Sequence, residues 1–175
     1  MLVSDGVPPS GADRALAEAR SRGVTVAVAE SLTGGLVCAM LTEAPGASDV
    51  VRGGVVAYQV DVKREVLGVP GALLDAQGPV CDDVAFAMAD GVKTLLRASV
   101  GIATTGVAGP EPHGGKPPGR VHIAAVGEGV RLVRHHDLVG DRISVVAQTC
   151  ALAIELLGEL VLLTPQRARR EGEQL

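Results

Sequence analysis

The sequence predicts an α/β domain whose sheet is mixed. Two runs of small and β-branched residues, at 24–29 and 100–105, are typical of buried strands, and helical patterns alternate with them. Further along, residues 120–126 and 131–138 flank Gly127-Glu128-Gly129, a pattern typical of an antiparallel hairpin. Alternating strands and helices favour the α/β class, and the hairpin adds antiparallel strands. A length of 175 residues suits one domain.

Glycine and proline residues separate the elements of the first half. A helix over 12–22 is ended by Gly23, which suits the residue after a helix. The strand at 24–29 stops at Glu30-Ser31, and a helix runs from about 35 to 43, closed by Pro45-Gly46. The apolar run at 50–58 contains Gly53-Gly54, which indicates a bulge or a close backbone approach. A short helix over 60–67 follows.

The second half begins with a long amphipathic helix. Asp82-Asp83 suit a helix start, and Val84, Met88 and Val92 begin one apolar face. The strand at 100–105, the hairpin and a final helix at about 141–163 complete the domain. We expect residues 1–10 to be a flexible lead-in, 11–164 to be the domain and 165–175 to be a charged tail.

Composition argues against several classes of function. The net charge is −4, there are one Tyr, one Phe and no Trp, and the only dense basic cluster is Arg167, Arg169 and Arg170. A nucleic-acid-binding role is therefore not expected, because it needs a basic face and often aromatic stacking. Three scattered cysteines favour a reducing cytoplasm over a disulfide framework. The N-terminus does not resemble a signal peptide, and polar residues interrupt the apolar stretch 145–163, so we expect no membrane span.

Ser31 is the first candidate for chemistry. It lies where a buried strand meets Gly34-Gly35 and an apolar helix. Such a turn can bring together a hydroxyl nucleophile and free backbone N–H groups that hold an oxyanion or a phosphate. A serine hydroxyl needs a base to remove its proton.

Lys63 is a better candidate base than any histidine. His113, His122, His135 and His136 show neither a triad pattern nor metal-site spacing, so no metal is predicted. A lysine acts as a base at neutral pH only if its pKa falls by about three units. Burial among apolar neighbours lowers the pKa in this way. The nearby carboxylates, Asp61 and Glu65, should point away from Lys63 on a helix. Considered without this context, a surface lysine is the favoured interpretation of Lys63.

Three further features could contact a substrate. Tyr58 could relay a proton or stack on a planar ring, or simply pack at a strand end. The loop at 105–110 follows the second buried strand, where ligands of open α/β sheets bind, although Gly-Pro turns are common. Arg142 lies in the first turn of a helix, where a cation is unfavourable, and this suggests an anionic partner such as a phosphate. An ordinary surface arginine is the alternative.

Together these segments resemble the CinA C-terminal domain family, whose characterised members are nicotinamide mononucleotide amidohydrolases. The resemblance covers residues 16–157, and six segments in order make it specific. They are Ala29-Glu30-Ser31-Leu32-Thr33-Gly34-Gly35, Pro45-Gly46-Ala47-Ser48, Gly53-Gly54-Val55-Val56-Ala57-Tyr58, Lys63 with Leu67-Gly68-Val69-Pro70, Thr105-Gly106-Val107-Ala108-Gly109-Pro110, and Gly140-Asp141-Arg142.

The resemblance implies a single three-layer α/β/α domain that hydrolyses the carboxamide of nicotinamide mononucleotide to nicotinate mononucleotide and ammonia. It implies Ser31 as nucleophile, Lys63 as base and Tyr58 as an assisting group, with no metal or other cofactor. It also implies a small-molecule nucleotide substrate and a homo-oligomer, in a stand-alone or excised form of the domain. The candidate substrate-binding residues are Glu30, Thr33, Gly34, Gly35, Thr105, Gly106, Ala108, Gly109 and Arg142, with backbone N–H groups at 33–35 expected to hold the oxyanion.

The sequence departs from the family pattern at three places. Leu32 replaces a usual cysteine, Cys81 replaces a serine that caps the long helix, and the loop 111–119 is shorter and richer in proline. Two alternatives therefore stay open: a catalytically weak nucleotide-binding or partner-binding module of the same fold, and a metal-dependent nucleotide pyrophosphatase. The latter would need clustered carboxylates, and only Asp82-Asp83 occur, which helix capping explains.

Overall fold

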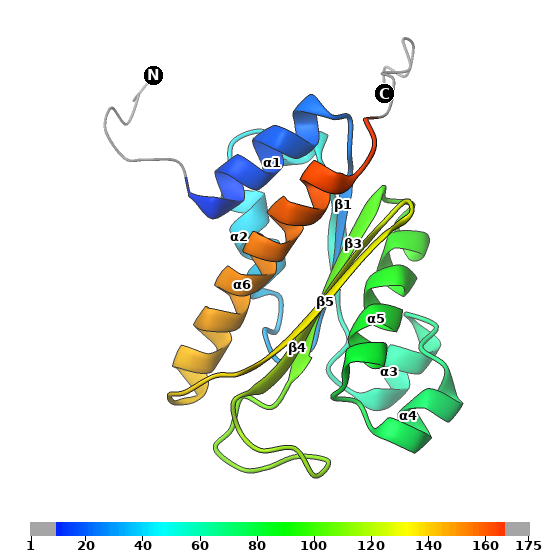
Figure 1. Cartoon of the computed structure of the whole chain (residues 1–175), viewed down its shortest axis with the longest axis vertical. Helices are drawn as coiled ribbons and strands as arrows, with labels where there is room; N and C mark the ends of the chain where they lie inside the picture. The colour runs from blue at the N-terminus through cyan, green and yellow to red at the C-terminus, as the bar shows by residue number, and fades with distance from the viewer. Residues whose placement is uncertain (1–9, 167–175) are drawn as a thin grey trace.

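A computed structural model describes residues 10–166, which form a five-stranded sheet with helices on both faces (Figure 1). The strands are β1 (Val26–Glu30), β2 (Val51–Val56), β3 (Val100–Gly106), β4 (Arg120–Gly127) and β5 (Val130–Asp137). Their order across the sheet is β2-β1-β3-β4-β5. β2, β1 and β3 are parallel, whereas β4 is antiparallel to both β3 and β5. The predicted mixed α/β sheet is therefore confirmed.

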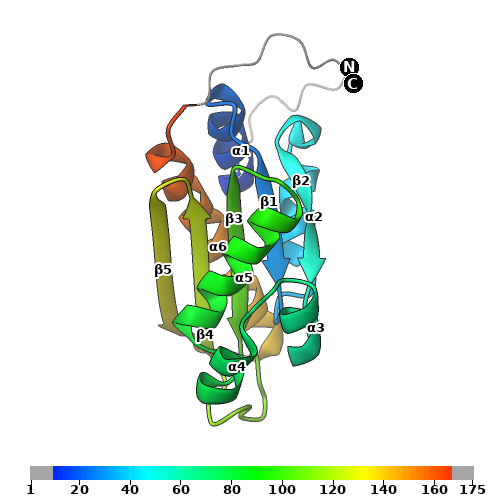
Figure 2. The same ribbon diagram turned by 90° about the vertical axis from the view of Figure 1, so that its right-hand side faces the viewer.

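The helices form two layers with the sheet between them (Figure 2). One layer holds α1 (Gly11–Ser21), α2 (Leu36–Glu43) and α6 (Arg142–Leu163), and the other holds α3 (Val60–Glu65), α4 (Gly71–Gln77) and α5 (Asp82–Leu95). In β1, Val28 belongs to the core on the α6 side and Ala29 to the core on the α5 side. Because both faces are covered, β1 and β3 are apolar without alternation, as the sequence shows.

The elements predicted from the sequence are all present, with predicted ends within about two residues of the observed ones. Gly23 has the left-handed backbone expected after α1. In β2, a register shift follows the Val26–Val51 pair, and a Cβ atom at Gly54 would lie 3.0 Å from the Cys38 sulfur. Both the bulge and the close approach predicted at Gly53-Gly54 thus occur. Two short elements were not predicted: α4 and the 3-10 turn η1 (Ala47–Asp49).

The last helix, α6, begins where the sequence predicts. Asp141 is its N-cap, and the Asp141 carboxylate accepts a hydrogen bond from the Ser144 amide at 2.8 Å. By length and composition alone α6 could cross a membrane, but half of its apolar window is buried inside this domain. Its buried residues pack with α1 and the sheet in one core. This burial is that of a core helix and gives no evidence of a membrane span.

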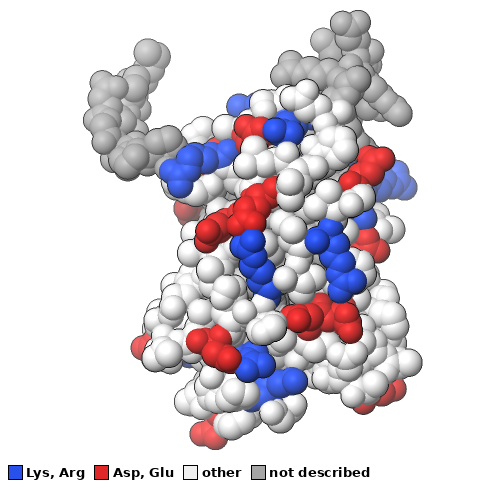
Figure 3. Space-filling model, viewed as in Figure 1, with Lys and Arg blue, Asp and Glu red and all other residues white. Residues whose placement is uncertain are grey.

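Charges of both signs alternate on the face shown in Figure 3. On the described surface, Arg134 forms a bidentate ion pair with Glu159 at 2.6 and 2.8 Å, and Arg120 pairs with Asp137. Exposed pairs of this kind contribute little to stability, typically about 0–1 kcal/mol each. They do show that these basic residues already have acidic partners.

Candidate active site

Ser31 lies at the carboxyl end of β1, in the turn that leads to α2. Its backbone N–H donates to the Thr104 carbonyl of the neighbouring strand β3, which continues the sheet by one residue. Gly34 and Gly35 both have positive φ angles, of 62° and 105°, so the turn needs glycine at these positions. Ser31 is 8% exposed and lines a pocket.

Glu30 has a structural role that the sequence did not reveal. Its side chain is almost fully buried, and its carboxylate accepts hydrogen bonds from the amides of Gly35, Val37 and Cys38 at 2.8–3.1 Å. A carboxylate at a helix N-terminus satisfies otherwise unpaired N–H groups and favours the helix dipole. The prediction that Glu30 contacts substrate is corrected: Glu30 caps α2 and fixes the turn that holds Ser31.

Lys63 points inward from α3 and meets Ser31. Its side chain is 1% exposed. The Nζ atom lies 2.8 Å from Ser31 Oγ and 2.6 Å from the Ala57 carbonyl oxygen, to which it also donates. The alternative of a surface lysine is therefore wrong. Two residues far apart in sequence form a buried hydroxyl–amine pair.

Burial lowers the pKa of Lys63 from 10.5 to about 8. Desolvation penalises the charged ammonium, and no carboxylate opposes this shift. Asp61 accepts from the Val62 amide and Glu65 pairs with Arg64 at the surface, so both point away as predicted. This decrease in the pKa of Lys63 is slightly smaller than the decrease of about three units that we expected a base at neutral pH to need. At pH 7 a pKa of about 8 leaves roughly a tenth of the amines neutral.

The Ser31–Lys63 pair opens into a pocket of about 320 Å³. Five of the nine predicted substrate-binding residues line it: Thr105, Gly106, Ala108, Gly109 and Arg142. Arg142 donates to the Gly109 carbonyl at 3.1 Å and to the Tyr58 hydroxyl at 3.2 Å, so it links the glycine-rich loop to the segment that follows β2. Tyr58 is 55% exposed at this pocket, and its hydroxyl bonds to Arg142 rather than to the Ser31–Lys63 pair.

Thr33, Gly34 and Gly35 do not line the pocket, and the amides of Gly34 and Gly35, predicted to hold an oxyanion, already have acceptors. The Gly34 amide donates to the Ser31 carbonyl, and the Gly35 amide donates to Glu30. The hydroxyl of Thr33 is buried and bonds to Thr104 Oγ1 at 2.7 Å. The two glycine amides and the Thr33 hydroxyl are therefore already engaged in hydrogen bonds that stabilise the turn. Within residues 10–166, the amides that lack an acceptor in this turn are those of Leu32 and Thr33.

Several pocket residues were not predicted. Pro79 and Val80 come from the segment between α4 and α5, and the Pro79 carbonyl accepts from the Thr105 hydroxyl at 2.8 Å. His113 and Glu111 line the pocket from the proline-rich loop. No sequence pattern points to the α4–α5 segment, whereas His113 in the proline-rich loop is a candidate base that the sequence disfavours relative to Lys63. The other unpredicted lining residues are Leu32, Gln59, Val60 and Val107.

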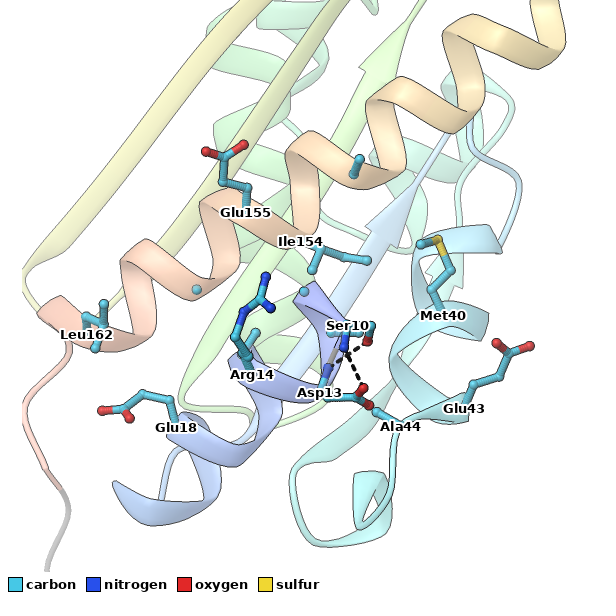
Figure 4. Close-up of a pocket in the computed structure, with 15 residues that line it drawn as sticks. Ser10, Asp13, Arg14, Glu18, Met40, Glu43, Ala44, Ile154, Glu155 and Leu162 are labelled. Atoms are coloured by element: carbon cyan, nitrogen blue, oxygen red, sulfur yellow. Dashed lines mark hydrogen bonds between the residues drawn. The ribbon is translucent and has the colours of Figure 1, made fainter. Parts of the chain in front are cut away.

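A larger hollow of about 900 Å³ lies between α1, α2 and α6 (Figure 4). Its polar residues include Ser10 and Asp13, which bond to each other as the capping box of α1. Ile154 and Met40 provide apolar walls. No serine–lysine pair faces it among the described residues, so the smaller pocket is the candidate active site.

The sequence suggested that the histidines are isolated from one another, but two of them lie next to Asp82. The Asp82 carboxylate lies 2.6 Å from His122 Nδ1 and 3.3 Å from His135 Nδ1. Burial works to raise the pKa of Asp82, but the hydrogen bonds from the two histidines outweigh it and lower this pKa. Asp82 therefore does more than favour a helix start, while Cys81, as expected, makes no side-chain cap bond to α5. Three different elements supply this cluster, so sequence spacing could not show it.

A family model, described as the CinA C-terminal domain, matches residues 10–161. The chain belongs to this family. It is 45% identical over 140 residues to a CinA-like protein of Frankia casuarinae, covering 80% of this chain and 32% of that one. It is 42% identical over 149 residues to a putative competence-damage inducible protein of Geobacillus kaustophilus, covering 82% and 36%. The chain thus spans about a third of the length of these curated relatives.

Solved structures of the CinA superfamily share the fold. A protein from Klebsiella pneumoniae superposes with a TM-score of 0.84 at 32% identity, covering 87% of this chain and 96% of that one. One from Escherichia coli gives 0.83 at 26% identity, covering 93% and 94%. The predicted family and the predicted single α/β domain are confirmed.

Proposed function

We propose that this CinA-family chain hydrolyses the carboxamide of nicotinamide mononucleotide, giving nicotinate mononucleotide and ammonia. The observation that carries the proposal is the distance of 2.8 Å between Lys63 Nζ and Ser31 Oγ inside a closed-in pocket. A buried amine of lowered pKa next to a serine hydroxyl is suited to activate that hydroxyl. The family resemblance supplies the substrate.

In the proposed reaction, the neutral amine of Lys63 removes the proton of Ser31 as Oγ attacks the carboxamide carbon. The tetrahedral intermediate collapses by breaking the C–N bond, and the Lys63 ammonium gives its proton to the departing nitrogen, which leaves as ammonia. Water, deprotonated by the same amine, then hydrolyses the ester on Ser31 and regenerates the hydroxyl. One water molecule is consumed for each ammonia released.

Of the amides first expected to hold the oxyanion, those of Gly34 and Gly35 already have acceptors, and Thr33 does not line the pocket. The amide of Leu32 is next to the nucleophile, its residue lines the pocket, and it has no acceptor within the described part of the chain. We propose this N–H as an oxyanion donor. Such a contact is typically worth about 3 kcal/mol in the transition state.

The nucleotide part of the substrate would occupy the rest of the pocket. A volume of about 320 Å³ is near the lower end of the range of roughly 300–1,000 Å³ for small-molecule sites. Arg142 offers a guanidinium for the phosphate. The exposed ring of Tyr58 offers a face for the pyridine, so we propose Tyr58 as a substrate contact as well as an assisting group.

The two alternatives have less support. A metal-dependent pyrophosphatase would need clustered carboxylates in the pocket, and Glu111 is the single carboxylate among its lining residues, which include neither Asp82 nor Asp83. An inactive binding module would not require a buried lysine at a serine hydroxyl, because burying this amine costs free energy. Neither alternative explains Lys63.

Ammonia release from nicotinamide mononucleotide in the presence of EDTA tests the proposal. We expect the wild type to release ammonia and form nicotinate mononucleotide, and Lys63→Met to abolish this. Lys93→Met is the matched control and should keep full activity, because Lys93 pairs with Asp90 on α5, away from the pocket. A wild type that binds the nucleotide without releasing ammonia would support the binding module. Activity lost with EDTA and restored by Mg²⁺ would support the metal-dependent alternative.

A further inference from the structure

A cluster of metal-ligating side chains lies outside the proposed active site. Asp82 is in the first turn of α5, and His122 and His135 are register partners on β4 and β5. Paired residues on neighbouring strands point to the same face of a sheet, so both imidazoles face the helix that carries Asp82. One potential ligand atom of each residue lies within 4.8 Å of those of the other two.

We propose that Asp82, His122 and His135 bind one divalent transition-metal ion of the zinc class. Two imidazole nitrogens and a carboxylate oxygen form a ligand set that suits zinc and its neighbours rather than magnesium or calcium. The ion would replace the protons now shared between the Asp82 carboxylate and the two Nδ1 atoms, at 2.6 and 3.3 Å. It would tie the first turn of α5 to the β4–β5 hairpin.

The exposure of the cluster fits a site that an ion can enter. The side chain of His122 is 7% exposed, whereas those of Asp82 and His135 are 45% and 57% exposed. The ion would therefore have one anchored imidazole on its inner side and water on its outer side. Three protein ligands leave coordination positions for that water.

Two nearby arginines have other acidic partners, although Arg120 also interacts electrostatically with the Asp82 carboxylate. Arg120 is held by Asp137 through two hydrogen bonds, and Arg131 pairs with Asp83 and lies over the Phe86 ring. The helix N-terminus itself disfavours a cation at this place. The negative charge of Asp82 must offset this repulsion between the helix N-terminus and the cation, because the two histidine ligands are neutral.

His122 also sets a limit on affinity. Its Nε2 atom is buried and, within residues 10–166, has no hydrogen-bond partner. Coordination through Nδ1 would move the ring proton to Nε2, where no acceptor receives it. Metal-bound histidines usually gain affinity from such an acceptor. We therefore expect an ion that a strong chelator removes, unlike that of a closed structural zinc site.

The site is separate from the proposed hydrolysis. None of its three residues lines the Ser31 pocket, although His122 is the register partner of Thr105, which does. Ammonia release is therefore expected to continue in EDTA, and the binding test below does not depend on that activity.

Zinc titration of the untagged chain, stripped with EDTA and desalted, tests the proposal by calorimetry. We expect one Zn²⁺ per chain, no comparable binding of Mg²⁺, and a melting temperature raised by Zn²⁺. His135→Asn and Asp82→Asn should weaken binding by at least about tenfold and remove the thermal shift. His136→Asn is the matched control, since His136 points to the opposite face of β5.

Three results would overturn the proposal. The first is wild-type zinc binding no tighter than that of His135→Asn. The second is equal loss of affinity in His136→Asn. The third is a thiolate-to-cobalt charge-transfer band when Co²⁺ replaces Zn²⁺, because it would place the ion on a cysteine. Both key variants alter partly exposed side chains, so melting curves without metal should show that they fold.

Discussion

At the scale of single residues, the proposed hydrolysis depends on the protonation of Lys63. Burial alone holds its pKa at about 8, while its Nζ keeps two hydrogen-bond acceptors, Ser31 Oγ and the Ala57 carbonyl. These contacts aim the amine at the hydroxyl, and the lowered pKa makes a neutral fraction available near physiological pH. The inward orientation of Lys63 on α3 thus explains both its contact with Ser31 and its lowered pKa.

The rate should follow this ionisation. Because the proposed base is the neutral amine of Lys63, kcat/KM for ammonia release should rise with pH up to about 8 and then level off. The slope below the plateau should be close to tenfold per pH unit. A stopped assay across the range in which the protein stays folded measures it. A profile already flat from about pH 6 would contradict the assignment of Lys63 as base.

Arg142 allows a prediction about the substrate phosphate. Arg142→Gln should raise KM for nicotinamide mononucleotide by about 10–100-fold, because a charge-assisted hydrogen bond to the phosphate contributes about 1.5–3 kcal/mol. The control is nicotinamide riboside, which has no phosphate and should be hydrolysed equally by both proteins. Equal loss with both substrates would show that Arg142 only positions Gly109 and Tyr58, to which it is bonded.

At the scale of elements, the short helices α2 and α3 hold Ser31 and Lys63 in place, and the longer helix α5 packs behind α3. α2 is held by Glu30, and α3 follows β2 closely so that Lys63 reaches the end of β1. α5 supports this arrangement through Gly91, where a Cβ atom would lie 2.0 Å from the Leu67 carbonyl oxygen. Helix α5 can therefore approach the segment behind α3 only because residue 91 has no side chain.

Two helical glycines give opposite predictions. Gly91→Ala should lower the free energy of unfolding by several kcal/mol, since the added methyl group meets backbone rather than a movable side chain. Gly158→Ala in α6 is the matched control. Its Cβ would make an ordinary contact of 3.9 Å with Ala15, so it should stabilise the protein by about 0.5–1 kcal/mol. Urea denaturation measures both. A stable Gly91→Ala variant would show that α5 is not packed as described.

At the scale of the whole molecule, the parallel strands bring the chemistry to one edge of the sheet. β1 ends at the turn with Ser31 and β3 at the glycine-rich loop, while the segment after β2 carries Tyr58 and Lys63. Ligands of open α/β sheets bind at such carboxyl ends. The antiparallel hairpin β4–β5 lies at the other side of the sheet and carries two of the three proposed metal ligands, His122 and His135.

The sequence was informative where a pattern is local. Apolar runs bounded by glycine located β1 and β3, and Asp141 marked the start of α6. It did not predict α4, which has seven residues and little periodicity. It also could not predict which way Glu30 points, because a carboxylate beside a nucleophile can face a substrate or a helix end. The Asp82–His122–His135 cluster depends on register between distant segments, which spacing in one chain does not show.

The proposed hydrolysis requires Ser31 as its nucleophile, and ammonia release by Ser31→Ala tests this requirement. The variant should keep the wild-type melting curve, because the change removes one small hydroxyl. Its kcat should fall by at least about 1,000-fold, since loss of a nucleophile is not replaced by neighbouring groups. A Ser31→Ala protein that releases ammonia within about tenfold of the wild-type rate would contradict the account.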